Sequence, residues 1–280
     1  MKILVTGGAG FIGSHVVDAY VAAGHEVAIL DDFSTGSLDN VNVDFVYRVD
    51  ICDRAMVRQV MELVHPDVVN HHAALVDVTE CQENPDKAHK VNVEGTRIVF
   101  DEAEAAGVKK FIFASSGGAI YGECRVSASE NTQANPRGVY GRTKYQAESV
   151  IQVPAYEITT VILRYGNVYG SRGERGVIPA FERAKKKQEP LVIYDDGEQV
   201  RDFISVFDVV RANVLALECG SSIFNIATGV STSIRDLACS IVGRRGIPHQ
   251  HFPARAGEIR ESRLDVSRAK QVLGFEALPW

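Results

Sequence analysis

Residues 2–13 read KILVTGGAGFIG, and this stretch decides the fold. The first five form an apolar run rich in β-branched side chains, and helical periodicity starts at Phe11. Glycine suits the turn between them because it permits the sharp bend, lets a phosphate approach the backbone, and lets the helix pack close to the strand. The helix N-terminus then directs unpaired N–H groups at the phosphates. The stretch therefore predicts a Rossmann-type dinucleotide turn at Gly7, Gly10 and Gly13.

An acid follows the second candidate strand, at the place where this kind of turn needs one. Asp31 ends the run Glu26–Asp31, 18 residues beyond Gly13. A carboxylate there hydrogen-bonds the adenosine ribose hydroxyls and repels a 2′-phosphate. The next residues, DFSTG (32–36), include no arginine or lysine that would accept that phosphate. The sequence therefore favours NAD over NADP.

The rest of the first two thirds alternates between strand-like and helical patterns. Strands are expected at Lys2–Thr6, Glu26–Asp31, Asp44–Tyr47, Asp67–His71, Lys110–Ala114 and Thr159–Leu163, and helices at Phe11–Ala23, Arg54–Val64, Lys87–Ala106 and Val139–Ile151. Right-handed crossovers place helices on both faces of such a sheet, so we expect an α/β fold with a doubly wound parallel sheet. Residues 1–165 are expected to form the NAD-binding domain. Residues 166–280 are expected to form a smaller substrate lobe, with part of 200–220 returning to the main domain.

Composition excludes several classes of protein. The net charge of −6 disfavours nucleic acid as a partner, since a polyanion binds best to a basic surface. No apolar run approaches the roughly 20 residues that span a membrane. The five cysteines form no CxxC pair and are interpreted as reduced thiols of a cytoplasmic protein. The spacing of His71, His72, Cys81 and His89 matches no metal site, so none is expected.

Tyr140 and Lys144 form a Tyr-x-x-x-Lys pair at the start of a predicted helix. Residues four apart share a helix face, so the two side chains are expected to lie together. A phenol has a reference pKa of about 10 and needs a nearby cation to act as a base. A proton acceptor beside a hydride acceptor suits alcohol oxidation.

An ordered series of further motifs covers nearly the whole chain. It comprises Asp50-Ile51, His71–Ala74, Asn92–Thr96, Phe113–Ser116, Tyr121-Gly122, Leu163–Gly170 and Arg201–Phe203. With these motifs the chain resembles the extended short-chain dehydrogenase/reductase family and, within it, the UDP-glucose 4-epimerases. The resemblance implies transient oxidation of a UDP-sugar at carbon 4, and a homodimer formed through the helices near 87–106 and 139–151.

The same resemblance implies roles for individual residues. Tyr140 would be the base, Lys144 would bind the nicotinamide ribose, and Ser116 would bond the sugar 4-oxygen. Cofactor contacts are expected from Gly7, Gly10, Phe11, Ile12, Gly13, Asp31, Asp32, Ser34, Thr35, Gly36, Asp50, Ile51, Ala73, Ala74, Asn92, Tyr140, Lys144 and Tyr165. Substrate contacts are expected from Ser116, Asn167, Val177, Arg201, Arg255, Glu258 and Ser262, with Asn167 and the two arginines holding the diphosphate.

Three alternatives stay open. Related dehydratases place an acid directly after the Ser/Thr, as water elimination requires, and some decarboxylases share a nearby glutamate. Here Ser116 is followed by Gly117-Gly118-Ala119-Ile120, which favours the epimerase. Ser262 stands where relatives restricted to plain hexoses tend to have tyrosine, so an N-acetylated sugar could also fit. A non-catalytic NAD-sensing protein is the alternative of a different class.

Overall fold

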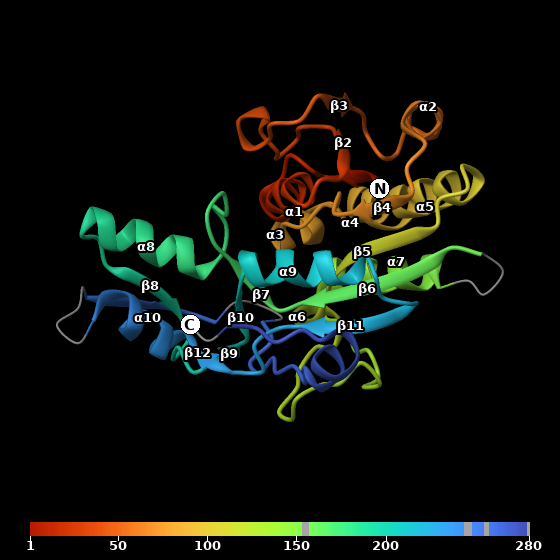
Figure 1. Ribbon diagram of the computed structural model, residues 1–280. Helices are drawn as coiled ribbons and strands as arrows, with labels where there is room; N and C mark the ends of the chain where they lie inside the picture. The colour runs from red at the N-terminus through yellow and green to blue at the C-terminus, as the bar shows by residue number, and fades with distance from the viewer. Residues whose placement is uncertain (153–156, 244–247, 255–257, 279–280) are drawn as a thin grey trace.

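A seven-stranded parallel sheet forms the centre of the computed structural model, which describes residues 1–152, 157–243, 248–254 and 258–278 (Figure 1). The strand order is β11-β6-β5-β4-β1-β2-β3, and every neighbouring pair is parallel. The strands are β1 (Lys2–Thr6), β2 (Glu26–Asp31), β3 (Phe45–Arg48), β4 (Val68–His71), β5 (Lys110–Ser116), β6 (Thr159–Tyr165) and β11 (Ser222–Ile226). The predicted doubly wound fold is confirmed.

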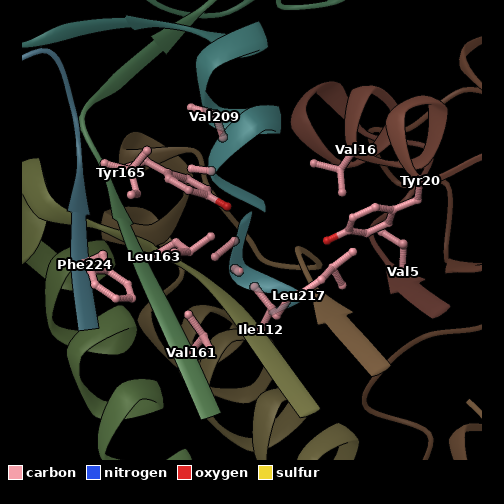
Figure 2. Close-up of a cluster of buried hydrophobic side chains, with 14 of the residues drawn as sticks. Val5, Val16, Tyr20, Ile112, Val161, Leu163, Tyr165, Val209, Leu217 and Phe224 are labelled. Atoms are coloured by element: carbon pink, nitrogen blue, oxygen red, sulfur yellow. The ribbon is translucent and has the colours of Figure 1, made fainter. Parts of the chain in front are cut away.

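Helices cover both faces because successive residues of each strand point to opposite sides. Ile3 and Val5 of β1 pack in one layer with α1 (Phe11–Ala22), α9 (Val206–Ala216) and the short π-helix η3 (Ala269–Leu273). Leu4, between them, packs in the other layer with α2 (Arg54–Val64), α5 (Thr96–Ala105) and α7 (Gly138–Ile151). Figure 2 shows the first layer, where the hydroxyl groups of Tyr20 and Tyr165 both point inward. Asn213 of α9 is hydrogen-bonded to both hydroxyls. Its side-chain amide donates to the Tyr165 hydroxyl at 2.9 Å, and its backbone carbonyl accepts from the Tyr20 hydroxyl at 3.2 Å.

The predicted helix over 87–106 is present but contains a π-helical segment. The pattern over 87–106 favours a single helix, but the structure has α4 (Pro85–His89), a wide π turn η2 (Lys90–Gly95) and then α5. Side-chain hydrogen bonds explain the π-helical segment. The Thr96 hydroxyl donates to the Asn92 backbone carbonyl at 2.7 Å, and the Asn92 side-chain amide is hydrogen-bonded to the backbone of Leu75. Such wide turns are common at functional sites.

The chain after β6 contributes to both parts of the molecule. Helix α9 packs against α1, and β11 pairs with β6 at the edge of the main sheet. A smaller group of elements lies at one end of the molecule (Figure 1) and shares a separate apolar core. Its elements are α8 (Val177–Lys187), β8 (Leu191–Tyr194), β9 (Val200–Arg201), β12 (Thr232–Ser233), α10 (Ile234–Val242) and β13 (His249–Phe252). Strands β7 (Asn167–Tyr169) and β10 (Phe203–Ser205) pair with each other. In the sequence, β7 lies between β6 and α8, and β10 lies between β9 and α9.

The carboxyl ends of the parallel strands meet at one edge of the sheet, which is where open α/β sheets bind ligands. The glycine turn follows β1, Asp31 ends β2, and Ala73 follows β4. Ser116 ends β5 directly beside Tyr165 of β6, with which it pairs in register. Two short helices complete this edge, α3 (Val78–Glu83) and α6 (Gly117–Ile120). Among the described residues, no helix has both the length and the apolar content to cross a membrane.

Candidate active site

The glycine turn is packed too closely to admit side chains. Gly7 has a φ of +65°, and a Cβ there would lie 2.6 Å from the Ala73 amide nitrogen. A Cβ on Gly13 would lie 2.2 Å from the Gly7 carbonyl oxygen, so helix α1 sits directly on the turn. The amides of Phe11 and Ile12 belong to the first turn of α1 and have no acceptor within the helix. The turn is therefore a backbone cradle suited to a pyrophosphate.

Asp31 holds the turn and the following loop together. Its carboxylate accepts hydrogen bonds from the amides of Ala9 (2.9 Å) and Phe33 (2.8 Å). Burial raises the pKa of this carboxyl, and the two amide bonds partly oppose that rise. Each oxygen keeps a second lone pair that a ribose hydroxyl could use. Asp31 therefore has the position and the free acceptors that the sequence predicts for it.

The remaining predicted cofactor residues surround the same edge. The loop 32–36 returns to the turn, since a Cβ on Gly36 would lie 2.9 Å from the Ala9 carbonyl carbon. In this loop the Asp32 carboxylate accepts hydrogen bonds from the amide and the hydroxyl of Ser34. Thr35 is exposed. Two pairs lie farther along the edge: Asp50 is exposed and Ile51 buried, and Ala73 and Ala74 are half-buried.

Asn92 has a different position from the one expected of a direct ligand. Its side-chain oxygen accepts from the Leu75 amide at 2.7 Å, and its nitrogen donates to the Leu75 carbonyl and the Thr143 hydroxyl, both at 3.0 Å. Both of its N–H groups are thereby committed to protein. Asn92 fixes the loop after β4 to helix α7, which carries Tyr140 and Lys144.

Tyr140 contacts Ser116, and Lys144 follows Tyr140 by one turn of α7. Tyr140 is hydrogen-bonded to Ser116, which lowers the phenol pKa, but burial is stronger and raises it to about 12. Lys144 is 4% exposed, with its Nζ 4.2 Å from the centre of the Phe113 ring. Burial lowers the pKa of Lys144 to about 8, while the charge of Glu148 raises it. Without a ligand, therefore, the phenol holds its proton at neutral pH and the lysine stands close to its titration range.

Tyr165 of β6 lies beside Ser116, with which it pairs across the two strands. It is buried, and its ring stacks on His72 with the centroids 6.3 Å apart. Burial lowers the pKa of His72 to about 3, with the charge of Lys144 as a second cause. The His72 Nε2 is buried and has no hydrogen-bond partner among the described residues. Both rings therefore form a neutral wall of the site.

Several predicted substrate residues converge on Gly118 of α6. A Cβ at Gly118 would lie 3.4 Å from the Asn167 Oδ1 and 3.5 Å from the Ser262 Oγ. Ser262 is 4% exposed and bonds the Val200 carbonyl through its amide at 3.2 Å. Three segments distant in sequence therefore meet at Gly118, a place that we call the Gly118 recess because the residues on its two sides, Gly118 and Ser262, are small.

Arg201 and Glu258 form a loose pair near this recess, with 3.6 Å between Nη2 and Oε1. Burial lowers the pKa of Arg201, which the charge of Glu258 opposes. Val177 begins α8. Arg255 lies outside the described residues.

Three residues of this region were not predicted from the sequence. In the sequence, Gly118 indicated only that no acid follows Ser116. In the structure, its lack of a side chain lets Asn167 and Ser262 approach the backbone there. Glu148 lies one helical turn beyond Lys144, a spacing that was readable from the sequence. Asn213 bonds Tyr165 from α9, and no local pattern indicated that contact.

These features define an α/β enzyme with a dinucleotide cradle and a Tyr–Lys–Ser group at the carboxyl edge of its sheet. The sequence profile of the NAD dependent epimerase/dehydratase family matches residues 3–227, and the chain belongs to that family. NAD is therefore its cofactor, as the sequence predicts.

Named relatives lie close to this chain. A protein of Methanocaldococcus jannaschii described as a putative UDP-glucose 4-epimerase is 41% identical over 96% of this chain and 92% of its own length. The crystal structure of a Thermotoga maritima UDP-glucose 4-epimerase with UDP-glucose has a TM-score of 0.95 and 40% identity, covering 99% of this chain and 94% of that one. The Thermus thermophilus UDP-glucose 4-epimerase, in complex with NAD, has a TM-score of 0.91 and 35% identity over 96% and 91% of the two chains.

Proposed function

We propose that this protein is an NAD-dependent UDP-glucose 4-epimerase, an isomerase that interconverts UDP-galactose and UDP-glucose. The observation that carries the proposal is the hydrogen bond between Tyr140 and Ser116, with the buried Lys144 one helical turn farther along α7. The similarity to UDP-glucose 4-epimerases over nearly the whole chain supports the same activity.

The cofactor fits the cradle, since the tight backbone contacts at Gly7 and Gly13 leave no room for side chains where a pyrophosphate would approach. The amides of Phe11 and Ile12 would bind the pyrophosphate, and Asp31 would accept the adenosine ribose hydroxyls. Lys144 would bind the nicotinamide ribose. When bound, NAD would supply the acceptor for the hydride from carbon 4 of the sugar, and its reduced form would be the hydride donor for the opposite face of the 4-keto sugar.

The side chains of this chain supply the proton chemistry. Ser116 orients the 4-hydroxyl, and Tyr140 takes its proton as the alcohol is oxidised. Tyr140 needs the Lys144 ammonium for this step, because burial by itself raises the phenol pKa to about 12. The same phenol returns the proton when the other epimer forms, so no net change of protonation accumulates.

Arg201 is suited to the diphosphate. It is largely buried, and its contact with Glu258 at 3.6 Å is too loose to saturate five N–H donors. A diphosphate there would provide the charge that burial otherwise makes costly. Asn167 and Val177 border the same region, and we assign them to the substrate with Arg201, Glu258 and Arg255.

Ser262 and Gly118 bear on the choice of sugar. Both are small and face the same recess, 3.5 Å apart when a Cβ is placed on Gly118. Because both residues are small where a bulkier side chain would narrow the site, we extend the proposal to UDP-GlcNAc and UDP-GalNAc.

Dehydration and decarboxylation are less well supported. Helix α6 follows Ser116 with GGAI and provides no acid. Glu123, the next acid along the chain, accepts the amides of Arg260 and Glu261 at 2.9 and 2.8 Å.

We also propose a cytoplasmic homodimer. All five cysteines are free thiols, which fits a reducing compartment. Helix α7 has outward-facing residues, among them Tyr145 at 40% exposure, that could pack against a second copy. Light scattering of the purified protein tests the dimer; a mass near the 30.6 kDa of one chain would contradict it.

Conversion of UDP-galactose to UDP-glucose, followed with a coupled dehydrogenase, tests the activity. Tyr140→Phe is expected to lower kcat by about 10²–10⁴-fold, the range of a general base, while NAD stays bound. Tyr47→Phe, in the edge strand β3, is the matched control and should retain full activity. A wild-type protein without this conversion, or a fully active Tyr140→Phe variant, would refute the proposal. NAD binding without turnover would favour the NAD-sensing alternative.

A further inference from the structure

Glu148 is a fully buried carboxylate in helix α7. It follows Lys144 by four residues and Tyr140 by eight, so the three side chains share one face of the helix. A buried carboxylate is costly unless hydrogen bonds and opposite charges compensate it, so its partners are informative.

Those partners come from the two strands that carry the neighbouring site residues. The Ser115 hydroxyl donates to the Glu148 Oε1 at 2.6 Å, and Arg164 donates to both carboxylate oxygens at 2.9 and 2.5 Å. Ser115 and Arg164 pair in register across β5 and β6. Ser116 directly follows the first, and Tyr165 directly follows the second. One carboxylate therefore ties α7 to the ends of both strands.

Arg164 is itself held in place. Its Nη1 donates to the Tyr121 hydroxyl at 2.7 Å, which in turn donates to the Asn225 Oδ1 at 2.8 Å. The guanidinium carbon also lies 5.0 Å from the centre of the Tyr121 ring. A two-point Arg–carboxylate contact with such support fixes the angle of the carboxylate as well as its position.

The charges of this cluster bear on Lys144. The groups that face its ammonium are the neutral Phe113 ring, His71 at the end of β4, His72 directly after it, and Glu148. Burial and the lysine charge lower the pKa of both histidines, so they are neutral and do not compensate it. Among the described residues, Glu148 is thus the anion that acts on Lys144. The cluster of Lys144, Glu148 and Arg164 carries one net positive charge, which ionisation of Tyr140 would cancel.

We propose that Glu148, clamped by Ser115 and Arg164, is a positioning residue that holds the Tyr140–Lys144 face of α7 against the ends of β5 and β6 and keeps the Lys144 ammonium charged. The proposal rests on the proposed function only for the roles of Tyr140 and Lys144. The contacts of Glu148 are independent of that function.

Direct titration of Lys144 tests the electrostatic part without substrate or turnover. In protein labelled with ¹³C-lysine, the Cε resonance absent from Lys144→Arg is assigned to Lys144 and followed against pH. The wild type should titrate near the pKa of about 8. Glu148→Gln, which keeps the shape but removes the charge, should lower the midpoint by about one pH unit. An unchanged midpoint in the folded variant would overturn the proposal.

The pH profile of kcat/KM gives a second readout. In Glu148→Gln, the pH at which kcat/KM falls on the alkaline side of the profile should be lower by about one unit. The activity on the acid side should be retained. A uniform loss at every pH would indicate a merely structural role and overturn the electrostatic one. Glu102→Gln is the matched control: Glu102 is a buried carboxylate paired with Arg54 and Arg58 between α2 and α5, and its loss should leave the pH of the alkaline fall unchanged.

Two further variants test the proposal if Glu148→Gln does not fold. Glu148→Gln/Arg164→Gln removes both charges of the pair, so neither Glu148 nor Arg164 is left as a buried ion without its partner. Its Lys144 midpoint should still fall, because Lys144 is acted on by Glu148 rather than by Arg164. Arg164→Lys keeps the carboxylate charged and should leave the midpoint unchanged; a fall as large as that of the double variant would overturn the proposal. If the wild type fails to epimerise UDP-sugars but these midpoints shift, the proposed function fails and this inference stands.

Discussion

The carboxylate of Asp31 accepts a hydrogen bond of 2.9 Å from the backbone amide of Ala9, in the middle of the glycine turn. The acid at the end of β2 is thus part of the turn at the end of β1, and a second bond from Phe33 fixes its other oxygen. Cofactor selection and the shape of the phosphate cradle therefore depend on the same side chain.

Asp31→Asn should weaken NAD binding at least about tenfold and reduce the preference over NADP, because an amide has one acceptor oxygen where the carboxylate uses two. Titration of each cofactor against the NAD-free protein measures both effects. Asp39→Asn, in the nearby exposed segment η1 (Leu38–Asn40), is the control and should bind NAD normally. Unaltered selectivity in Asp31→Asn would contradict the role of Asp31.

Gly13→Ala should abolish NAD binding and lower stability, since the new Cβ would lie 2.2 Å from the Gly7 carbonyl oxygen and force α1 away from the turn. Gly220→Ala is the matched control, because its Cβ meets no atom within 4 Å. Thermal unfolding and NAD titration of both variants measure the effect. Normal NAD binding by Gly13→Ala would show that the turn is not the cradle.

Lys144→Met should stabilise the NAD-free protein at pH 7 while destroying activity. Burial lowers the pKa of Lys144 from 10.5 to about 8, so below pH 8 the folded protein bears the cost of a buried charge. Between pH 8 and 10.5 the unfolded chain holds a proton that the folded one has released, so this cost fades as the pH rises. The variant should gain up to about 3 kcal/mol at pH 7, at 1.36 kcal/mol per pKa unit, and little at pH 10.5.

Urea unfolding of the wild type and the Lys144→Met variant at both pH values measures this difference. Lys185→Met, in the exposed last turn of α8, serves as the control for loss of a lysine and should show no such pH dependence. Equal stability of Lys144→Met and wild type at both pH values would mean that the buried ammonium costs nothing.

Ser262→Tyr should abolish turnover of N-acetylated UDP-sugars and preserve that of UDP-glucose. The Ser262 hydroxyl faces the Gly118 recess, and a phenol ring in its place would fill it. Assays with UDP-GlcNAc and UDP-glucose side by side measure the effect. Equal losses with the two substrates would indicate a folding defect, and unchanged use of both would remove Ser262 from sugar selection.

Local patterns were sufficient for the parallel sheet and the cofactor site. The strand–turn–helix of 2–22, the acid at Asp31 and the i, i+4 spacing of Tyr140 and Lys144 each express a short-range constraint, so the sequence carries them directly. The π-helical segment η2 escaped prediction because it depends on Asn92 bonding Leu75, a contact across 17 residues that leaves the helical periodicity intact.

Tertiary structure alone decided which polar groups the site can use. Glu148 reads in the sequence as an ordinary polar residue of a helix, and Arg164 as part of a strand. Their pairing, the commitment of Ser115 and the convergence of Gly118, Asn167 and Ser262 arise where strand ends and loops from distant parts of the chain meet. A sequence specifies backbone geometry over a few residues, but burial and hydrogen-bond partners depend on what the whole fold places alongside, and these set the charge states on which the chemistry rests.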